Sequence, residues 1–215
     1  MTLPTRLLIP AKLIFEAASK ANVRAVLFGG AAVNLHGAKR ETKDIDINVT
    51  SFKFLDRLPA PPFDHRPGSA PTRRRLTYYH PTDAIKCDLA INSTYLVDGF
   101  LERYSEVTED GVRYASADML LADKIRTFGQ RHAQNPKRDS DLEDIGHLLG
   151  VLLDKNGKVP SEVMKAILDE MTLKAFWTVL PGEEHAVYRD FLTDVGIVIP
   201  DEVCLSLRPL ARAAN

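Results

Sequence analysis

The sequence predicts an α+β fold in which a mixed α/β first half is followed by a helical second half. Residues 44–49 and 85–91 alternate apolar and polar side chains, the period-two pattern of strands with one buried face. After Ser116 the apolar residues change to helical spacing and keep it for most of the remaining chain. We therefore expect two domains, at residues 1–115 and 116–215, with a mixed sheet flanked by helices in the first.

The start of the chain predicts a helix, a strand, a tight turn and a second, shorter helix. Residues 10–21 carry apolar side chains at the spacing of an amphipathic helix. The compact apolar run Val23–Phe28 stops at Gly29-Gly30, as a buried strand that ends in a tight turn would. Residues 31–35 then look like the start of a short helix, which precedes the first alternating strand.

The rest of the first half predicts a loop, two strands and a hairpin. Residues 59–71 contain five prolines, so we expect an irregular loop there. Residues 75–80 are expected to form a strand before the alternating strand at 85–91. Asp110-Gly111 is flanked by apolar residues, which is typical of a β-hairpin turn.

The second half predicts helices throughout. Four are expected, over residues 117–131, 139–153, 161–180 and 183–195. Ser116 is a suitable N-cap for the first of them. Ser140 and Glu143 have the spacing of a capping box at the start of the second. No role is assigned to residues 183–215.

Charge and composition argue against several classes of protein. With 28 basic and 29 acidic side chains the formal net charge is -1, whereas a dedicated duplex-DNA binder is usually more basic. No stretch approaches about 18 consecutive apolar residues, so no membrane span is expected. Cys87 and Cys204 lie far apart and lack metal-ligand spacing, which predicts no disulfide framework and a reducing, cytoplasmic location.

Asp44 and Asp46 are candidate ligands of a magnesium ion. On a strand, side chains two residues apart project from the same face, with Cα atoms about 6.6 Å apart. Two carboxylates so placed repel each other, and a cation that binds oxygen ligands, such as magnesium, relieves the repulsion. Asp88 would add a third carboxylate if its strand pairs beside the first, and such a set can hold two cations. The alternative interpretation is a solvated strand face.

Gly29-Gly30 is a candidate phosphate-binding turn. Glycine at the end of a strand permits a positive φ and lets the backbone approach a ligand closely. Free N–H groups at the start of a following helix favour an anion such as phosphate. A tight turn without a ligand is the alternative. The order strand, Gly-Gly, helix and Asp-x-Asp strand favours a phosphate site and a metal site close together.

The same segments carry a resemblance to a known superfamily. Phe28-Gly29-Gly30, then Asp44-Ile45-Asp46, then a later strand carboxylate, resembles the signature of the DNA polymerase β nucleotidyltransferases. The segment 27–49, in which Arg40 and Thr42 precede the first aspartate, is similar to small nucleotidyltransferases of the abortive-infection toxin type (AbiEii-like). The resemblance is good over residues 23–49.

A weaker part of the resemblance lies further along the chain. It is moderate around the Asp88 strand. In residues 122–149, Lys124 precedes an Arg-Asp pair, here Arg138-Asp139, as in that family. The last third of the chain shows no usable resemblance.

The resemblance implies a role for each candidate residue. The residues implied to bind the nucleotide are Gly29, Gly30, Arg40 and Thr42. Asp44, Asp46 and Asp88 would bind magnesium in a two-metal site, and Asp88 would also help to deprotonate the acceptor. Lys124 would contact a phosphate from the helical half.

Several residues keep two interpretations. Lys124 is either a phosphate ligand or a surface lysine. Asp139, Asp141 and Asp144 either orient Lys124 or the acceptor, or complement the helix dipole, and the dipole interpretation is preferred for Asp141. The basic group 73–75, beside aromatic residues, either steers RNA or a nucleotide base or is a solvated loop. A second basic group at 131–138 either contacts an anionic acceptor or consists partly of helix-end cations. His36 either contacts a phosphate or makes a structural hydrogen bond.

The predicted activity is magnesium-dependent transfer of a nucleoside monophosphate from a nucleoside triphosphate (NTP) to a hydroxyl group. The toxin-like resemblance implies a tRNA or protein acceptor and an antitoxin as a possible partner. The alternatives are an aminoglycoside or lincosamide nucleotidyltransferase, with a small-molecule acceptor, and a non-catalytic nucleotide-binding module of the same fold.

Overall fold

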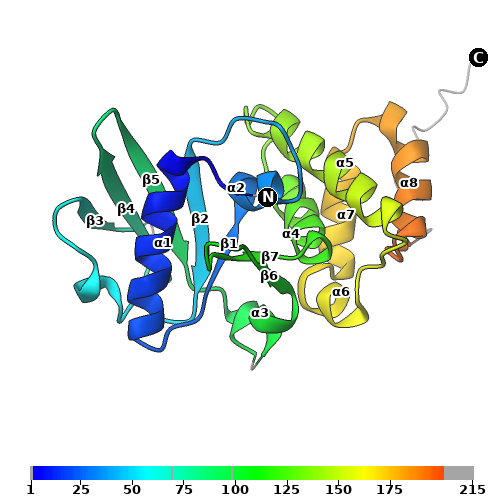
Figure 1. Cartoon of the computed structure of the whole chain (residues 1–215). Helices are drawn as coiled ribbons and strands as arrows, with labels where there is room; N and C mark the ends of the chain where they lie inside the picture. Colours follow the sequence, from blue (N-terminus) through cyan, green and yellow to red (C-terminus); the bar gives the residue numbers. More distant parts are fainter. Residues whose placement is uncertain (1, 69, 98, 201–215) are drawn as a thin grey trace, which may run out of the picture. The chain divides into compact units, whose positions relative to one another are not determined.

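The computed structural model describes residues 2–68, 70–97 and 99–200 (Figure 1). Contacts between residues divide the chain into two units, Met1–Leu120 and Leu121–Asn215, and each is described by itself. The predicted domain limits of 1–115 and 116–215 stay a prediction. The prediction of no disulfide framework concerns Cys87 and Cys204. Cys204 lies outside the described residues, and Cys87 is a buried free thiol.

The first unit contains a mixed sheet with the strand order β3-β4-β5-β2-β1-β7-β6. In the pairs β2–β5 and β1–β7 the strands are parallel, and in the other pairs they are antiparallel. The strands span Ala25–Phe28 (β1), Asp44–Val49 (β2), Phe63–Pro67 (β3), Arg73–His80 (β4), Asp83–Ala90 (β5), Ser105–Val107 (β6) and Arg113–Ala115 (β7). The α+β prediction is confirmed for this part of the chain.

Helices α1, α2 and α3 accompany this sheet and span Thr5–Lys20, Gly29–Leu35 and Phe100–Arg103. Helix α1 contacts β2 and β5, and α2 contacts β1 and β2 (Figure 1). The buried residues of α1 recur every three or four positions and include Leu7, Ala11, Ile14 and Ala18. Burial of this apolar stripe and of alternate strand residues forms the core of the unit.

The helices and strands predicted for the first unit occur in the predicted order, with three corrections, and α3 is an additional short helix that was not predicted. Helix α1 begins at Thr5 rather than residue 10, and α2 begins at Gly29 rather than residue 31. The proline-rich segment 59–71 is not a pure loop, because β3 lies inside it and pairs with β4. Proline is tolerated there because β3 is an edge strand.

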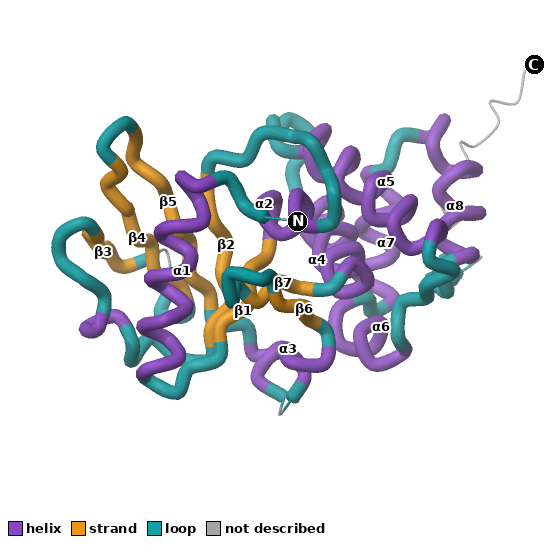
Figure 2. The backbone as a smooth tube through the Cα atoms, in the orientation of Figure 1, coloured by secondary structure: helices purple, strands orange, loops and turns teal. Residues whose placement is uncertain are grey.

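The second unit is helical (Figure 2). Its helices span Ala117–Gln130 (α4, which begins in the first unit), Arg138–Asp154 (α5), Ser161–Ile167 (α6), Glu170–Val179 (α7) and His185–Asp194 (α8). Its buried aromatic residues are Phe128, Phe176, Trp177 and Tyr188. Two short 3₁₀ segments, at Leu55–Arg57 and Ser93–Leu96, belong to the first unit, and a third covers Gly182–Glu184.

Three details of the helix prediction are wrong. The single helix expected over 161–180 is two helices, because Asp169 caps α7 by accepting a hydrogen bond from the Thr172 N–H at 2.8 Å. Ser140 lies inside α5 and donates to the Lys137 carbonyl, so it is no cap. Among the described residues Ser116 Oγ has no hydrogen-bond partner, although α4 does begin after it.

Within residues 2–68, 70–97 and 99–200, no helix has the length and apolar character needed to cross a membrane.

Candidate active site

The predicted carboxylates lie on neighbouring strands of the first unit. Asp44 and Asp46 are partly exposed and alternate along β2 with the buried residues Ile45 and Ile47. The parallel strand β5 places Asp88 directly beside Asp46. Register neighbours project from the same face of a sheet. The structure therefore brings the three predicted metal ligands to one polar face.

The end of β1 brings the glycine turn to the same point. Phe28 pairs with Asp46 across the antiparallel β1–β2 ladder, and Gly29 follows with a φ of 61°. A Cβ on Gly29 would overlap Asp46 Oδ2. Glycine is required here for two reasons, its left-handed backbone and its contact with the carboxylate.

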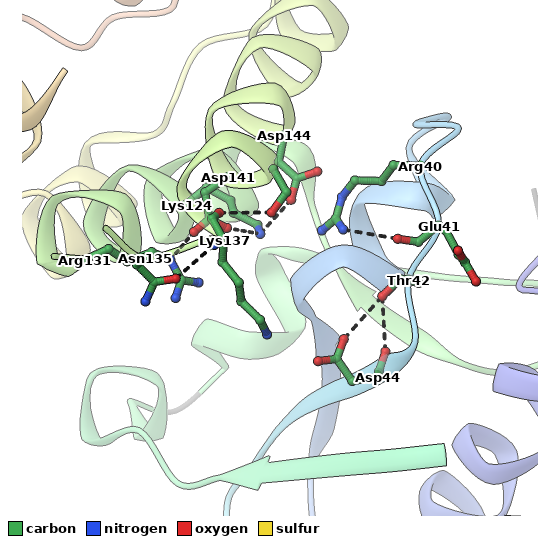
Figure 3. Close-up of polar contacts among 11 residues, drawn as sticks. Arg40, Glu41, Thr42, Asp44, Lys124, Arg131, Asn135, Lys137, Asp141 and Asp144 are labelled. Carbon is green, nitrogen blue, oxygen red and sulfur yellow. Dashed lines mark hydrogen bonds and ion pairs between the residues drawn. The ribbon is translucent and has the colours of Figure 1, made fainter. Parts of the chain in front are cut away.

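Arg40 and Thr42 lie in the segment that connects α2 to β2. A Cβ on Gly30 would overlap Arg40 Nη2, so the guanidinium lies against the second glycine. Thr42 is 5% exposed, and its hydroxyl donates to Asp44 Oδ1 and to the Asp44 carbonyl, both at 3.4 Å (Figure 3). The predicted nucleotide-binding residues thus surround the start of α2 and the start of β2. Their role in binding a nucleotide stays a prediction.

Arg75 belongs to the basic group 73–75, which lies on strand β4 rather than in a solvated loop, and the sequence did not identify its partner. It lies opposite Asp88 on the antiparallel strand β4, and its Nε donates to Asp88 Oδ1 at 2.7 Å. The pairing raises the pKa of Arg75, mainly through the hydrogen bond to Asp88. A signal was present in the sequence. A two-residue turn at Pro81-Thr82 joins β4 to β5, and a two-residue hairpin loop fixes which residues face each other.

The donor set at this face suits a hard divalent cation. Within the described residues, no three carboxylate, imidazole or thiol groups converge as a metal cluster. The carboxylates nevertheless make one region of negative potential. Burial raises the pKa of the Cys87 thiol, and the charges of Asp88, Asp46 and Asp44 raise it further. The carboxylates of Asp44 and Asp46 are of the kind that magnesium prefers, Asp88 is paired with Arg75, and metal binding by the three residues stays a prediction.

Lys124 lies in the second unit and is buried, with 7% of its surface exposed. Its Nζ lies 2.8 Å from Asp141 Oδ1 and 2.7 Å from Asp144 Oδ2, and Arg131 pairs with the other oxygen of Asp141 (Figure 3). Burial alone would lower the Lys124 pKa, but the charges of Asp141 and Asp144 and their hydrogen bonds outweigh burial and raise it.

This buried cluster corrects two interpretations. Lys124 is not a surface lysine. The helix-dipole interpretation preferred for Asp141 is insufficient, because its 2% exposed carboxylate pairs with Lys124 and Arg131. Asp144 also pairs with Lys124, whereas Asp139 is exposed. The phosphate-binding role of Lys124 stays a prediction.

Two further candidates have structural partners. The His36 ring nitrogen Nε2 lies 2.9 Å from the Ala115 carbonyl, and its ring packs against Tyr114, which supports the structural interpretation. In the second basic group, Arg138 donates to the Val179 carbonyl and lies 4.7 Å from the centre of the Phe128 ring. Arg131 and Arg138 of this group therefore take part in the packing of the second unit, whereas His132 and Lys137 are exposed.

A hollow of about 510 Å³ lies at the other end of β1. It is lined by α1, the start of β1, α3 and the β6–β7 hairpin, with charged residues of both signs such as Lys12, Glu16 and Glu102. None of the predicted site residues lines it. The polar face of β2 and β5 is a separate feature of the same unit.

Solved structures show which known fold this arrangement matches. An antigenic nucleotidyltransferase-like protein from Paracoccidioides brasiliensis is 16% identical, with a TM-score of 0.60 over 92% of this chain and 95% of that chain. ANT(2'')-Ia in complex with adenylyl-2''-tobramycin is 14% identical, with a TM-score of 0.51 over 75% of this chain and 97% of that chain. The nucleotidyltransferase fold predicted from the sequence is confirmed.

No protein-family profile matches the sequence, and no curated protein sequence matches it. The AbiEii-like assignment stays a prediction.

Gly29→Ala should destabilise the first unit and disturb the carboxylate site. The left-handed φ costs about 1–2 kcal/mol for a residue with a Cβ. Overlap with Asp46 adds about 1–3 kcal/mol. Gly111→Ala is the matched control, because Gly111 has a φ of 79° and open space around its Cβ position. Urea denaturation of both variants should show a larger loss at Gly29, and equal losses would contradict the contact.

Proposed function

We propose that this chain is a magnesium-dependent nucleotidyltransferase that moves a nucleoside monophosphate from an NTP to an acceptor hydroxyl. The observation that carries the proposal is the pairing of Phe28 with Asp46 and of Asp46 with Asp88. This register places a glycine turn at the start of a helix, whose first N–H groups have no partner within the helix, against a set of carboxylates. The nucleotidyltransferase fold of the structural neighbours supports the same chemistry.

Each residue of the site has a proposed role in binding the triphosphate or the metal. Gly29 and Gly30 would let the backbone approach the triphosphate closely, with the Arg40 guanidinium supplying positive charge beside them. Asp44 and Asp46 would hold magnesium with Asp88, and Thr42 would orient Asp44 through its hydroxyl. Bound magnesium would supply charge stabilisation to the phosphates.

The proposed reaction is a nucleotidyl transfer and requires no oxidant or reductant. The acceptor oxygen forms a bond to the α-phosphorus, and the bond from that phosphorus to the pyrophosphate oxygen breaks. The acceptor proton leaves to a carboxylate of the site, for which Asp88 is the candidate. Pyrophosphate is the leaving group. Catalysis of this kind depends mainly on positioning and on stabilisation of charge.

A pyrophosphate-release screen tests the activity. Each of four NTPs is incubated with the protein and magnesium against pools of tRNA, cell-lysate protein, or aminoglycosides and lincosamides. We expect release that requires one acceptor pool and is abolished by EDTA. Nucleotide binding without release in any pool would instead support the non-catalytic binding module.

The acceptor has two candidate classes. The toxin-like approach of Arg40 and Thr42 to the aspartates favours tRNA or protein, with an antitoxin as a partner of that class. The fold shared with ANT(2'')-Ia, whose structure holds an adenylylated aminoglycoside, favours an antibiotic hydroxyl. Expression in bacteria separates them. Growth arrest relieved by Asp46→Asn supports a toxin, whereas drug tolerance without arrest supports the antibiotic acceptor.

A further inference from the structure

Asp88 is a shared carboxylate between two neighbouring strands. On one side, the parallel strand β2 places Asp46 in register with it. On the other side, the antiparallel strand β4 places Arg75 in register with it. Asp88 therefore has a like charge beside it on β2 and an opposite charge beside it on β4. The two oxygens of its carboxylate cannot interact fully with a group on the β4 side and with a group on the β2 side at the same time.

The structure shows which side holds the carboxylate. Arg75 Nε donates to Asp88 Oδ1 at 2.7 Å, and Arg75 Nη2 donates to Oδ2 at 3.4 Å. Two parallel N–H···O bonds of this kind direct both oxygens toward the guanidinium. The side chains are 58% and 34% exposed for Arg75 and Asp88. Water therefore screens the pair, and opening it is inexpensive.

We propose that Arg75 is a positioning residue that holds Asp88 while no cation is bound and releases it when a divalent cation binds at Asp44 and Asp46. The inference rests on the proposed function, because it takes these aspartates as the cation site. With a cation held by Asp44 and Asp46, the Asp88 carboxylate would turn toward Asp46 and its pair with Arg75 would open. The guanidinium is then available to an anionic substrate on the same face of the sheet.

The polar face of β4 provides a matched control. Arg73 lies two residues from Arg75 on the same strand and therefore on the same face. It pairs in register with Ala90, whereas Arg75 pairs with Asp88. Arg73→Gln removes the same charge from the same face and leaves the pair intact. A difference in Mn²⁺ affinity between the two Gln variants therefore reports the loss of the Arg75–Asp88 pair rather than the loss of one positive charge from this face.

Binding of Mn²⁺ to the full chain, followed by the loss of its free-ion EPR signal, tests the proposal. Arg75→Gln should bind Mn²⁺ about three- to tenfold more tightly than wild type, because an exposed pair competes only weakly. Arg73→Gln should change the affinity less than about twofold, and Arg75→Lys should lie between wild type and Arg75→Gln. Equal effects of Arg75→Gln and Arg73→Gln would overturn the proposal.

The Arg75 Nε–H resonance gives a readout that does not depend on affinity. Its peak in a ¹H–¹⁵N spectrum is identified by its absence in Arg75→Gln. Addition of Mg²⁺ should shift this peak and speed its exchange with water, while wild-type Mn²⁺ binding is shown in parallel. A peak that stays unchanged at saturating Mg²⁺ would overturn the proposal even if Arg75→Gln binds more tightly.

The double variant Asp44→Asn/Asp46→Asn distinguishes a failure of the proposed cation site from a failure of the proposed release of Asp88 by Arg75. If the double variant loses Mn²⁺ binding but Arg75→Gln and Arg73→Gln change the Mn²⁺ affinity equally, the proposed release of Asp88 by Arg75 is wrong and the proposed cation site stands. If wild type binds no Mn²⁺, or the double variant binds as wild type does, the proposed cation site is wrong and the role of Arg75 falls with it.

Discussion

Asp46→Asn should lower the rate of nucleotidyl transfer by on the order of 10³-fold or more, which matches the loss of a key electrostatic group in an active site. Asp46 lies at the centre of the site, against Gly29 and beside Asp88. The amide keeps the shape of the side chain but removes the charge that we propose binds magnesium. It also removes the repulsion from Asp44 and Asp88, so the free energy of unfolding should be unchanged or higher.

The measurement combines transfer of label from radiolabelled NTP with urea denaturation of the same preparation. Asp64→Asn is the control, because Asp64 is an acidic residue on edge strand β3 of the same sheet. It should retain transfer within about twofold, the range expected for surface charge changes. Retained transfer in Asp46→Asn, or equal losses in both variants, would contradict the assignment of the site.

Lys124→Met should lower the free energy of unfolding by about 3–5 kcal/mol, the usual cost of removing one partner from a buried ion pair. Lys124, Asp141 and Asp144 are all under 10% exposed. Met preserves most of the side-chain volume but leaves the Asp144 carboxylate without its Lys124 partner in the interior. Asp141 keeps Arg131. The effect concerns stability and does not depend on any role at a phosphate.

Chemical denaturation with a matched set of variants checks this. Lys174→Met, at an exposed position of α7, should cost under about 0.5 kcal/mol, as surface substitutions usually do. Lys124→Met/Asp144→Asn should recover part of the loss, because the amide no longer carries the buried charge that Lys124 balanced. A Lys124→Met protein as stable as Lys174→Met would show that the ion pairs are not maintained in solution.

The alkaline pH dependence follows from the pKa of Lys124. Its folded pKa is raised above the ordinary value of 10.5. The stability it contributes is therefore complete below pH 10.5 and is lost as the pH rises through the folded pKa. The difference in unfolding free energy between wild type and Lys124→Met should be constant from pH 7 to about 9.5 and should shrink only at higher pH.

Much of the first unit could be predicted because local patterns and pairing agree. Residues 44–49 alternate, so Ile45 and Ile47 had to face the core and the aspartates had to share the other face. The Gly29 turn followed from a compact apolar run that stops at two glycines. Edge strand β3 was missed because the prolines of segment 59–71, of which only Pro67 lies in the strand, hide a short strand that hydrogen bonds to β4 stabilise.

The features that were missed depend on particular contacts and on burial rather than on a repeating sequence pattern. Lys124 and Asp144 meet because α4 and α5 bury one face of each helix, and helical spacing alone does not identify a buried charge. The split of residues 161–180 depends on one capping residue, Asp169, inside a continuous apolar pattern. The pair Arg75–Asp88 required the register of the β4–β5 hairpin, which the Pro81-Thr82 turn encodes.

Calorimetric titration of the protein with a non-hydrolysable NTP analogue tests the central claim most directly. Wild type should bind the analogue in magnesium and lose binding in EDTA, and Asp44→Asn/Asp46→Asn should lose it even with magnesium present. Urea denaturation of the double variant confirms that it is folded. Binding that survives both EDTA and the double substitution would contradict a cation-dependent nucleotide site at Gly29, Asp44 and Asp46.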